Sequence, residues 1–149
     1  MSDRDNVTMQ IQITDLLESY IETIEDTEVA VLLSGGVDSL SVAFGADRVG
    51  KKITAYSFRL DAHDNYDNKK AKRTAEEFGW HHEECMVDTR RLKADFMILM
   101  YDYQCKKKTH FECVFPFMYV YPLIVERAVL TGWGADGYYG VSKKAHIHY

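Results

Sequence analysis

The chain has 149 residues, of which 46% are apolar and 13% aromatic, and its formal net charge is −5. This length fits one domain with a sizeable core, and no apolar run approaches the ~20 residues that a membrane-spanning helix needs. The acidic balance argues against a general nucleic-acid-binding surface, which requires a basic patch.

The first third of the chain predicts a helix followed by a strand–helix–strand unit. Apolar residues such as Ile13, Leu17 and Ile24 recur at helical spacing and predict an amphipathic helix over 7–28. We therefore divide the chain into an N-terminal packing helix, residues 1–28, and a main domain, residues 29–149. Within the main domain we expect a buried strand at 29–34, a helix at 38–49 and a second strand at 52–60.

The rest of the chain continues the alternation of strands and helices. We expect a loop at 61–67, a helix at 68–78, an edge strand at 80–87, a helix at 89–103, a helix from Pro116 that Pro122 kinks or ends, and a fourth strand at 127–131. This pattern is typical of an α/β fold with a parallel central sheet and helices on both faces. Ligands of such sheets bind beyond the carboxyl ends of the strands.

The most informative motif follows the first predicted strand and reads Ser34-Gly35-Gly36-Val37-Asp38-Ser39. Its glycines tolerate positive φ and allow backbone N–H groups to approach a bound oxyanion. The following helix N-terminus adds unpaired donors and a favourable dipole. The serines offer hydroxyl groups and Asp38 offers an oxygen ligand, so a phosphate-rich ligand with Mg²⁺ is the expected occupant. The spacing GxxxxGKS/T of a Walker A loop is absent.

This motif resembles the SGGxDS loop of the N-type ATP pyrophosphatases, or PP-loop proteins. A second glycine-rich loop, Thr131-Gly132-Trp133-Gly134-Ala135-Asp136-Gly137, follows the fourth predicted strand and is similar to the SGEGADELFGGY motif of asparagine synthetase. Together the loops resemble the C-terminal synthetase domain of that family, whose relatives include β-lactam synthetase and lasso-peptide cyclases. The resemblance implies an adenine nucleotide alpha hydrolase-like fold of the HUP type.

The resemblance also implies a function and a site. The function is that of an ATP-dependent, AMP- and pyrophosphate-forming ligase that adenylates a carboxylate or amide oxygen for attack by a nitrogen nucleophile. Asp38 and Asp136 would hold Mg²⁺ and would be catalytic together with Ser39. The remaining implied ATP-binding residues are Leu32, Leu33, Ser34, Gly35, Gly36, Val37, Ser57, Phe58, Gly132 and Trp133.

The chain departs from the family pattern in the second loop. Trp133 stands where the family has a glutamate, and Gly137 stands where a second acidic residue usually follows the aspartate. Because an indole cannot perform acid–base chemistry, amidation of free aspartate is in doubt. Trp133 either stacks on a flat substrate or packs in the protein. The family also carries a lysine further downstream, which Lys143, Lys144 or a partner subunit could replace.

Two other functions remain open. A sulfur-transfer enzyme acting on RNA uses the same loop but needs a catalytic cysteine, for which Cys105 and Cys113 are candidates. A nucleotide-binding subunit without chemistry of its own would tolerate the departures in the second loop. The cysteines lack CxxC spacing and the N-terminus lacks an export signal, so we expect a cytoplasmic protein with a small-molecule substrate and no membrane partner.

Overall fold

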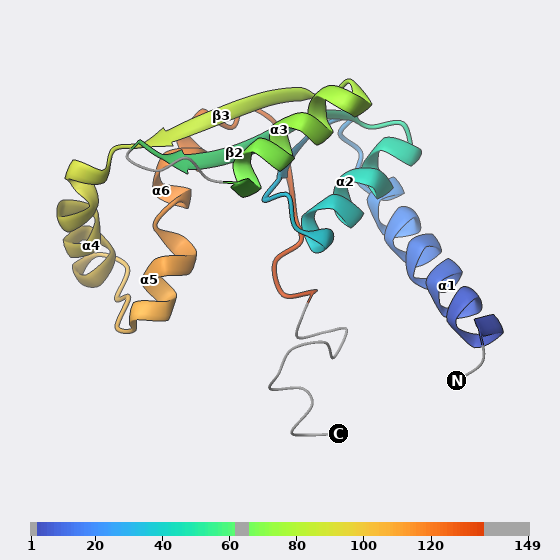
Figure 1. The fold of residues 1–149 in the computed structure, drawn as a ribbon, viewed down its shortest axis with the longest axis horizontal. Coiled ribbons are helices and arrows are strands. Elements are labelled where there is room, and N and C mark those ends of the chain that lie inside the picture. Colours follow the sequence, from blue (N-terminus) through green and yellow to red (C-terminus); the bar gives the residue numbers. More distant parts are fainter. Residues whose placement is uncertain (1–2, 62–65, 136–149) are drawn as a thin grey trace.

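The structure is a computed structural model that describes residues 3–61 and 66–135, with side chains from Ile13 onward (Figure 1). Its elements are α1 (Asp3–Glu22), β1 (Glu28–Leu32), α2 (Val37–Arg48), β2 (Lys52–Leu60), α3 (Tyr66–Phe78), β3 (His81–Val87), α4 (Leu92–Tyr101), α5 (Lys108–Val114), α6 (Phe117–Val120) and β4 (Ala128–Thr131). Short 3₁₀ helices cover Thr89–Arg91 and Tyr121–Leu123.

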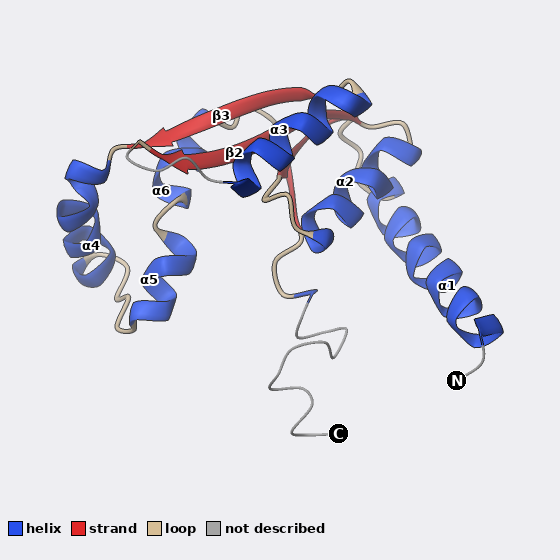
Figure 2. Ribbon diagram, in the orientation of Figure 1, coloured by secondary structure: helices blue, strands red, loops and turns tan. Residues whose placement is uncertain are grey.

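The four described strands form one parallel sheet in the order β3-β2-β1-β4. Figure 2 shows the neighbouring strands β2 and β3 in red. Leu32, the last residue of β1, lies in register between Tyr56 of β2 and Thr131 of β4. The segments that follow β1 and β4 therefore leave the same edge of the sheet side by side. β3 lies at the outside of the described sheet, as its charged sequence predicted.

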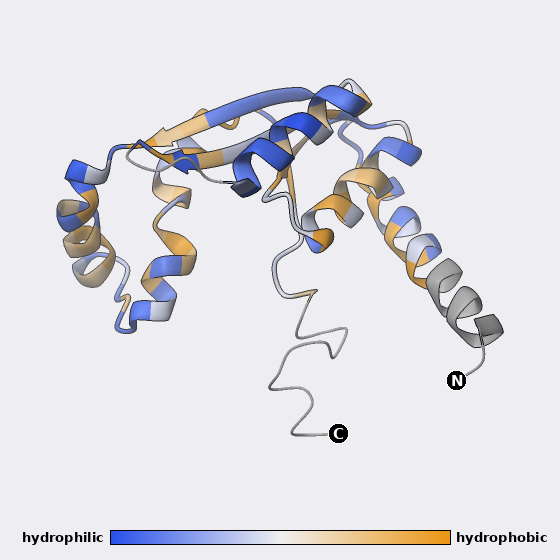
Figure 3. Ribbon diagram, viewed as in Figure 1, coloured by the Kyte–Doolittle hydropathy of each residue, from blue (hydrophilic) through white to orange (hydrophobic). Residues whose placement is uncertain are grey.

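Helices cover both faces of the sheet, which confirms the expected α/β class. Alternate residues of β1 point to opposite faces, because successive side chains of a strand alternate. Val29 and Val31 pack in a core with α1, α2 and α3, whereas Ala30 packs in a second core with β2, β3 and Val120 of α6. Figure 3 shows α3 as mostly hydrophilic, consistent with its buried side chains being only Asn68 and two alanines.

The N-terminal helix is shorter than expected and ends at Glu22, not at residue 28. The side chain of Lys51 explains the early end, since its Nζ donates to the carbonyl oxygens of Ile24 and Asp26 at 2.5 and 3.1 Å. The two carbonyl oxygens therefore accept from a lysine side chain and not from the N–H groups of a following helical turn. Ile21 lies in the same core as β1, so the helix packs directly on the sheet domain.

The region between β3 and β4 differs most from expectation. We did not predict α5. The predicted helix from Pro116 is present as the four-residue helix α6, which ends before a 3₁₀ turn that contains Pro122, as expected. Phe111 stacks on Phe115 with ring centroids 5.3 Å apart and also contacts Phe96 of α4. The contact between Phe111 and Phe96 joins two helices and is a tertiary interaction that local periodicity does not reveal.

Two smaller corrections concern helix starts. α3 begins at Tyr66, inside the predicted loop 61–67, and the predicted helix 89–103 divides into a 3₁₀ turn and α4. The side chain of Asp88 accepts a hydrogen bond from the backbone N–H of Arg90 and so starts the tighter turn. No helix among residues 3–61 and 66–135 has the length and apolar character needed to cross a lipid bilayer.

Replacing Ile21 by alanine should destabilise the fold, because this side chain is 1% exposed and fills the space between α1 and the sheet. We expect the free energy of unfolding to fall by about 2–5 kcal/mol in urea titrations. Leu16→Ala, a change on the same helix at a side chain that is 71% exposed, should cost within about 0.5 kcal/mol. Equal losses in the two variants would contradict the packing of α1 described here.

Candidate functional site

The turn between β1 and α2 presents backbone N–H groups at the carboxyl edge of the sheet. Gly35 adopts φ +76°, a left-handed conformation that glycine accepts without strain. Gly36 is the N-cap of α2 and makes no side-chain capping bond. The N–H groups in the first turn of α2 therefore lack a capping side chain and form a potential anion site.

Two serines hold this turn together. The Ser34 hydroxyl lies 3.0 Å from the Ser39 hydroxyl, and the Ser34 N–H donates to Ser39 Oγ at 3.2 Å. Ser39 Oγ also donates to the carbonyl oxygen of Gly36 at 3.1 Å. Ser39 is buried whereas Ser34 is exposed, so Ser39 is well placed to shape the loop and Ser34 to touch a ligand.

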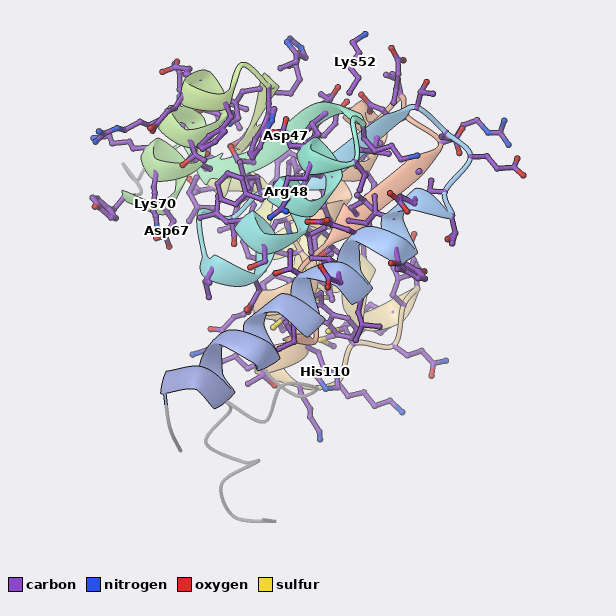
Figure 4. All side chains as sticks on the ribbon, turned by 90° about the vertical axis from the view of Figure 1, so that its right-hand side faces the viewer. Asp47, Arg48, Lys52, Asp67, Lys70 and His110 are labelled. Atoms are coloured by element: carbon purple, nitrogen blue, oxygen red, sulfur yellow. The ribbon has the colours of Figure 1, made fainter. Side chains whose placement is uncertain are left out.

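The start of α3 supports the first loop from outside. A β-carbon on Gly35 would lie only 2.8 Å from the carbonyl oxygen of Asp67 and 3.4 Å from Cβ of Lys70. Figure 4 labels Asp67 and Lys70 together on α3. The close approach requires glycine at position 35. It also brings Lys70, a cation that the sequence analysis did not single out, to the rim of the loop.

The loop after β4 rests directly on the first turn of α2. A β-carbon on Gly132 would lie 2.5 Å from the carbonyl carbon of Asp38 and 2.6 Å from the backbone nitrogen of Ser39. No side chain fits into that space. The contact joins the two glycine-rich loops, which are almost a hundred residues apart in the sequence.

Trp133 is held on a tight turn in this second loop. The N–H of Ala135 donates to the carbonyl oxygen of Gly132 at 3.3 Å, and Gly134 adopts φ +89°, as a type II turn requires at its third residue. The backbone N–H of Trp133 donates to Thr131 Oγ1 at 3.2 Å. The indole is 81% exposed although its backbone is fixed on both sides.

A cavity of about 250 Å³ opens where the loops meet. Its walls come from β1, β2, β4, the two loops and α6, and they are formed by Leu32, Leu33, Ser34, Asp38, Ser39, Tyr56, Ser57, Phe58, Phe117, Val120, Thr131, Gly132 and Trp133. Polar side chains gather at the first loop, whereas the β2 and α6 walls carry aromatic and aliphatic groups.

The structure brings most of the predicted site residues to this cavity. Gly35 and Gly36 shape the first loop without lining the cavity, and the side chain of Val37 is 74% exposed. Asp136 lies outside the described residues, so its pairing with Asp38 stays a prediction. Among the described residues no group of three or more His, Cys, Asp or Glu side chains could hold a metal ion.

Four lining residues were missed by the sequence analysis. Tyr56 and Thr131 are the register partners of Leu32, so aligning the ends of the predicted strands would have found them. Phe117 and Val120 lie on α6, and no motif marks them. The hydroxyl of Tyr56 donates to Glu126 Oε2 at 2.9 Å, and burial together with this bond raises the pKa of Tyr56 to about 12.

The side chain of Ser57 points to a polar network beside the cavity. Its hydroxyl donates to Asn68 Oδ1 of α3 and lies 2.9 Å from His82 Nε2 of β3. Asn68 donates in turn to Glu84, which also accepts from Arg59 at 2.6 Å. Because its side chain is engaged there, Ser57 would meet a ligand in the cavity through its main chain.

This network fixes α3, whose first turn supports Gly35. Burial lowers the pKa of His82 and outweighs the opposing charge of Glu84. The hydrogen bond from Arg59 holds the pKa of Glu84 below its usual value. The network is therefore most stable with His82 neutral and Glu84 charged.

The fold of the chain is that of the PP-loop proteins. The family model of asparagine synthase matches residues 12–147, and the chain belongs to the asparagine synthase family. This is a family of ATP-dependent PP-loop ligases. No curated protein sequence matches the chain at a significant level.

Solved structures with the same fold include two synthetases. NMN synthetase from Francisella tularensis matches with a TM-score of 0.59 and 18% identity over 90% of this chain and 57% of its own. NH3-dependent NAD synthetase from Campylobacter jejuni, in complex with nitrate, matches with a TM-score of 0.56 and 15% identity over 87% of this chain and 56% of its own. The chain thus spans little more than half of these neighbours.

A third neighbour was solved with a nucleotide. Glutamine-dependent NAD+ synthetase from Acinetobacter baumannii, in complex with ADP, matches with a TM-score of 0.54 and 16% identity over 85% of this chain and 25% of its own. At these identities the likeness shows the fold alone. It confirms the expected PP-loop architecture.

Gly132→Ala should force the two loops apart, because the new methyl group would overlap backbone atoms of Asp38 and Ser39, which give way less easily than the end of a flexible side chain. We expect a loss of about 1–3 kcal/mol in the free energy of unfolding, measured with urea. Gly36→Ala is the control, since its methyl group would meet only Ser34 Oγ at 3.3 Å. If both changes had the same small effect, the loops would not be in the contact described.

The polar network predicts a pH dependence of stability. The unfolded chain binds a proton on His82 near the ordinary pKa of about 6.5, whereas the folded chain binds it only at lower pH. The free energy of unfolding should therefore fall as the pH drops from 7.5 to 5. His82→Gln should reduce this slope in urea titrations at each pH, and the exposed neighbour change His81→Gln should not. A slope unchanged by His82→Gln would contradict the assignment.

Proposed function

We propose that the chain is an AMP- and pyrophosphate-forming ligase that adenylates a carboxylate or amide oxygen and transfers the activated group to a nitrogen nucleophile. The observation that carries this proposal is the contact of Gly132 with the backbone of Asp38 and Ser39. This contact places the first glycine-rich loop, the carboxylate of Asp38 and the second glycine-rich loop with Trp133 around one cavity. Membership of the asparagine synthase family supports the same chemistry.

In this proposal the first loop binds the β- and γ-phosphates of ATP. Backbone N–H groups from Gly35 to Ser39 and the hydroxyl of Ser34 would donate to the phosphate oxygens. The dipole of α2 favours the negative charge of the leaving pyrophosphate. Lys70 would add a cation at the rim of the loop.

The position of Asp38 fits a magnesium ion. A carboxylate in the first turn of α2 and on the wall of the cavity would repel a bound triphosphate unless a cation lay between them. We propose that Asp38 and Asp136 hold this ion. Bound Mg²⁺ would neutralise charge on the pyrophosphate as it leaves.

The adenine base would lie at the carboxyl end of β2. Ser57 and Phe58 line this part of the cavity, and Leu32 lines it from β1. We propose that the main-chain groups of Ser57 and Phe58 meet the base. Base, phosphates and second substrate would then follow the strand order from β2 through β1 to β4. Such an order puts the α-phosphate near the centre of the cavity.

The proposed reaction has two steps. The substrate oxygen attacks the α-phosphorus of ATP, the bond from that phosphorus to the bridging oxygen of the β-phosphate breaks, and pyrophosphate leaves. The nitrogen nucleophile then attacks the activated carbon and loses a proton to solvent, and AMP leaves with the carbon–oxygen bond electrons. The chain's own groups orient the phosphates in the first step and exclude water from the acyl adenylate in the second.

A nucleotide-binding subunit without turnover is the second candidate, and one observation favours it. Trp133, which replaces the acidic residue of the family motif, stands at the cavity and has no acid–base group. Binding of ATP without product formation would distinguish this candidate. The sulfur-transfer candidate is less favoured, because none of the three cysteines lines the cavity.

We further propose a cytoplasmic protein with a small-molecule substrate. We also propose that a second copy of the chain or a partner subunit contributes to the site.

Asp38→Asn should lower pyrophosphate release from ATP at least 100-fold, because the neutral amide is a poor ligand for Mg²⁺. The assay would supply ATP, Mg²⁺, ammonium and each of a panel of carboxylic acids, with AMP and pyrophosphate as the measured products. Asp102→Asn, at the exposed end of α4, is the matched control and should keep full turnover. Formation of ADP and phosphate by the unaltered protein would overturn the proposal.

A further inference from the structure

We infer that the oxygen-bearing substrate carries a planar conjugated ring that stacks on Trp133. This inference rests on the proposed function and names the substrate class for the same cavity. It assigns a specificity role to the residue that departs most clearly from the family motif.

The first step of the argument is that Trp133 is presented and not buried. Its indole is 81% exposed, yet the residue lines the cavity. By contrast Trp80, the other tryptophan of the chain, is 7% exposed, stacks on Phe78 and donates to Asp47. Trp80 is thus a core residue, whereas the indole of Trp133 has a face available for a ligand.

The second step is that the backbone of Trp133 is fixed beside the cavity. The type II turn over residues 132–135, the bond from the Trp133 N–H to Thr131 and the close packing of Gly132 on Asp38 hold this backbone in place. The indole is therefore attached at a defined point of the cavity wall, where a flat ring can stack on its exposed face.

The third step is that Trp133 lies apart from the proposed adenine site. In the sheet order β2-β1-β4, the proposed base position at β2 and Trp133 after β4 lie on opposite sides of β1. Neighbouring strands are about 4.8 Å apart, so the two places are separated by about two strand spacings. The phosphate loop stands between them. Trp133 is therefore free for the second substrate and lies beside Asp38, near the reacting phosphate.

The fourth step concerns chemistry. An indole offers a flat apolar face and has no acid or base group. The remaining cavity wall adds Phe117 and Val120 and no positive side chain. An aromatic acid fits the wall formed by Trp133, Phe117 and Val120 better than a small amino acid does, because its ring buries more apolar area against that wall. Its carboxylate then extends toward the first glycine-rich loop.

The test uses the two tryptophans of the chain as reporters. In the Trp80→Phe background Trp133 is the single indole, and its fluorescence reports ring stacking directly. Benzoate and 2-naphthoate would be titrated in the presence of Mg²⁺ and an ATP analogue with a methylene group between the α- and β-phosphorus atoms. Cyclohexanecarboxylate, with the same charge and nearly the same size as benzoate but no planar ring, is the matched probe.

We expect benzoate or 2-naphthoate to quench the fluorescence and to bind at least tenfold more tightly than cyclohexanecarboxylate. Calorimetry on the unaltered chain and on Trp133→Leu gives the same comparison without the Trp80 change. The preference for a ring should disappear in Trp133→Leu and survive in part in Trp133→Phe.

The outcomes separate the two proposals. If the ATP analogue binds but ring and saturated acids bind equally, or if Trp133→Leu keeps the preference, the inference is overturned, whereas the nucleotide site that the proposed function requires is supported. If the analogue does not bind to the unaltered chain, the proposed function itself fails.

Discussion

The close contact between Gly132 and the first turn of α2 is the constraint on which the candidate site depends. Only a residue without a β-carbon fits there, because a β-carbon on Gly132 would lie 2.5 Å from the carbonyl carbon of Asp38. This contact turns two loops from distant parts of the chain into the two sides of one cavity. A second close approach, between Gly35 and the start of α3, fixes the first loop from its other side.

The parallel sheet creates the conditions for this contact. Because Leu32 lies in register between Tyr56 and Thr131, the strand ends form one platform, and the loops continue from it in the same direction. The two faces of the sheet pack against different helices. On one face the core with α1, α2 and α3 supports the first glycine-rich loop, and on the other face α6 packs against the sheet. The polar network around Asn68 joins α3 to β2 and β3, so the support of the phosphate loop extends into the sheet.

Much of this arrangement is predictable from the sequence because its signals are local. The strand at 52–60 was predicted with its observed bounds, and the first glycine-rich loop lies at the end of β1, as predicted. Its role as an anion site stays a prediction. The α/β alternation and the motif spacing gave the fold class. These features depend on strand periodicity and on glycine, whose effects act over a few residues.

The rest depends on contacts between distant segments. The helix from Pro116 was predicted, but α5 was not located, since Phe111 of α5 packs on Phe96 of α4, a residue from another segment of the chain. For the same reason Phe117 and Val120 were not recognised as cavity residues. Lys70 became relevant only because α3 packs against Gly35. The sequence could name Trp133 as a departure, but not show that its indole is exposed at the cavity.

The most direct test of the account is a titration of the ¹⁵N-labelled protein with Mg²⁺ and ATP, followed by the chemical shifts of the backbone amides. The account predicts the largest shifts at Gly35 to Ser39, with a second group at Gly132 and Trp133. Shifts confined to α4 and α5, with both glycine-rich loops unchanged, would contradict a shared nucleotide site at the meeting point of the loops.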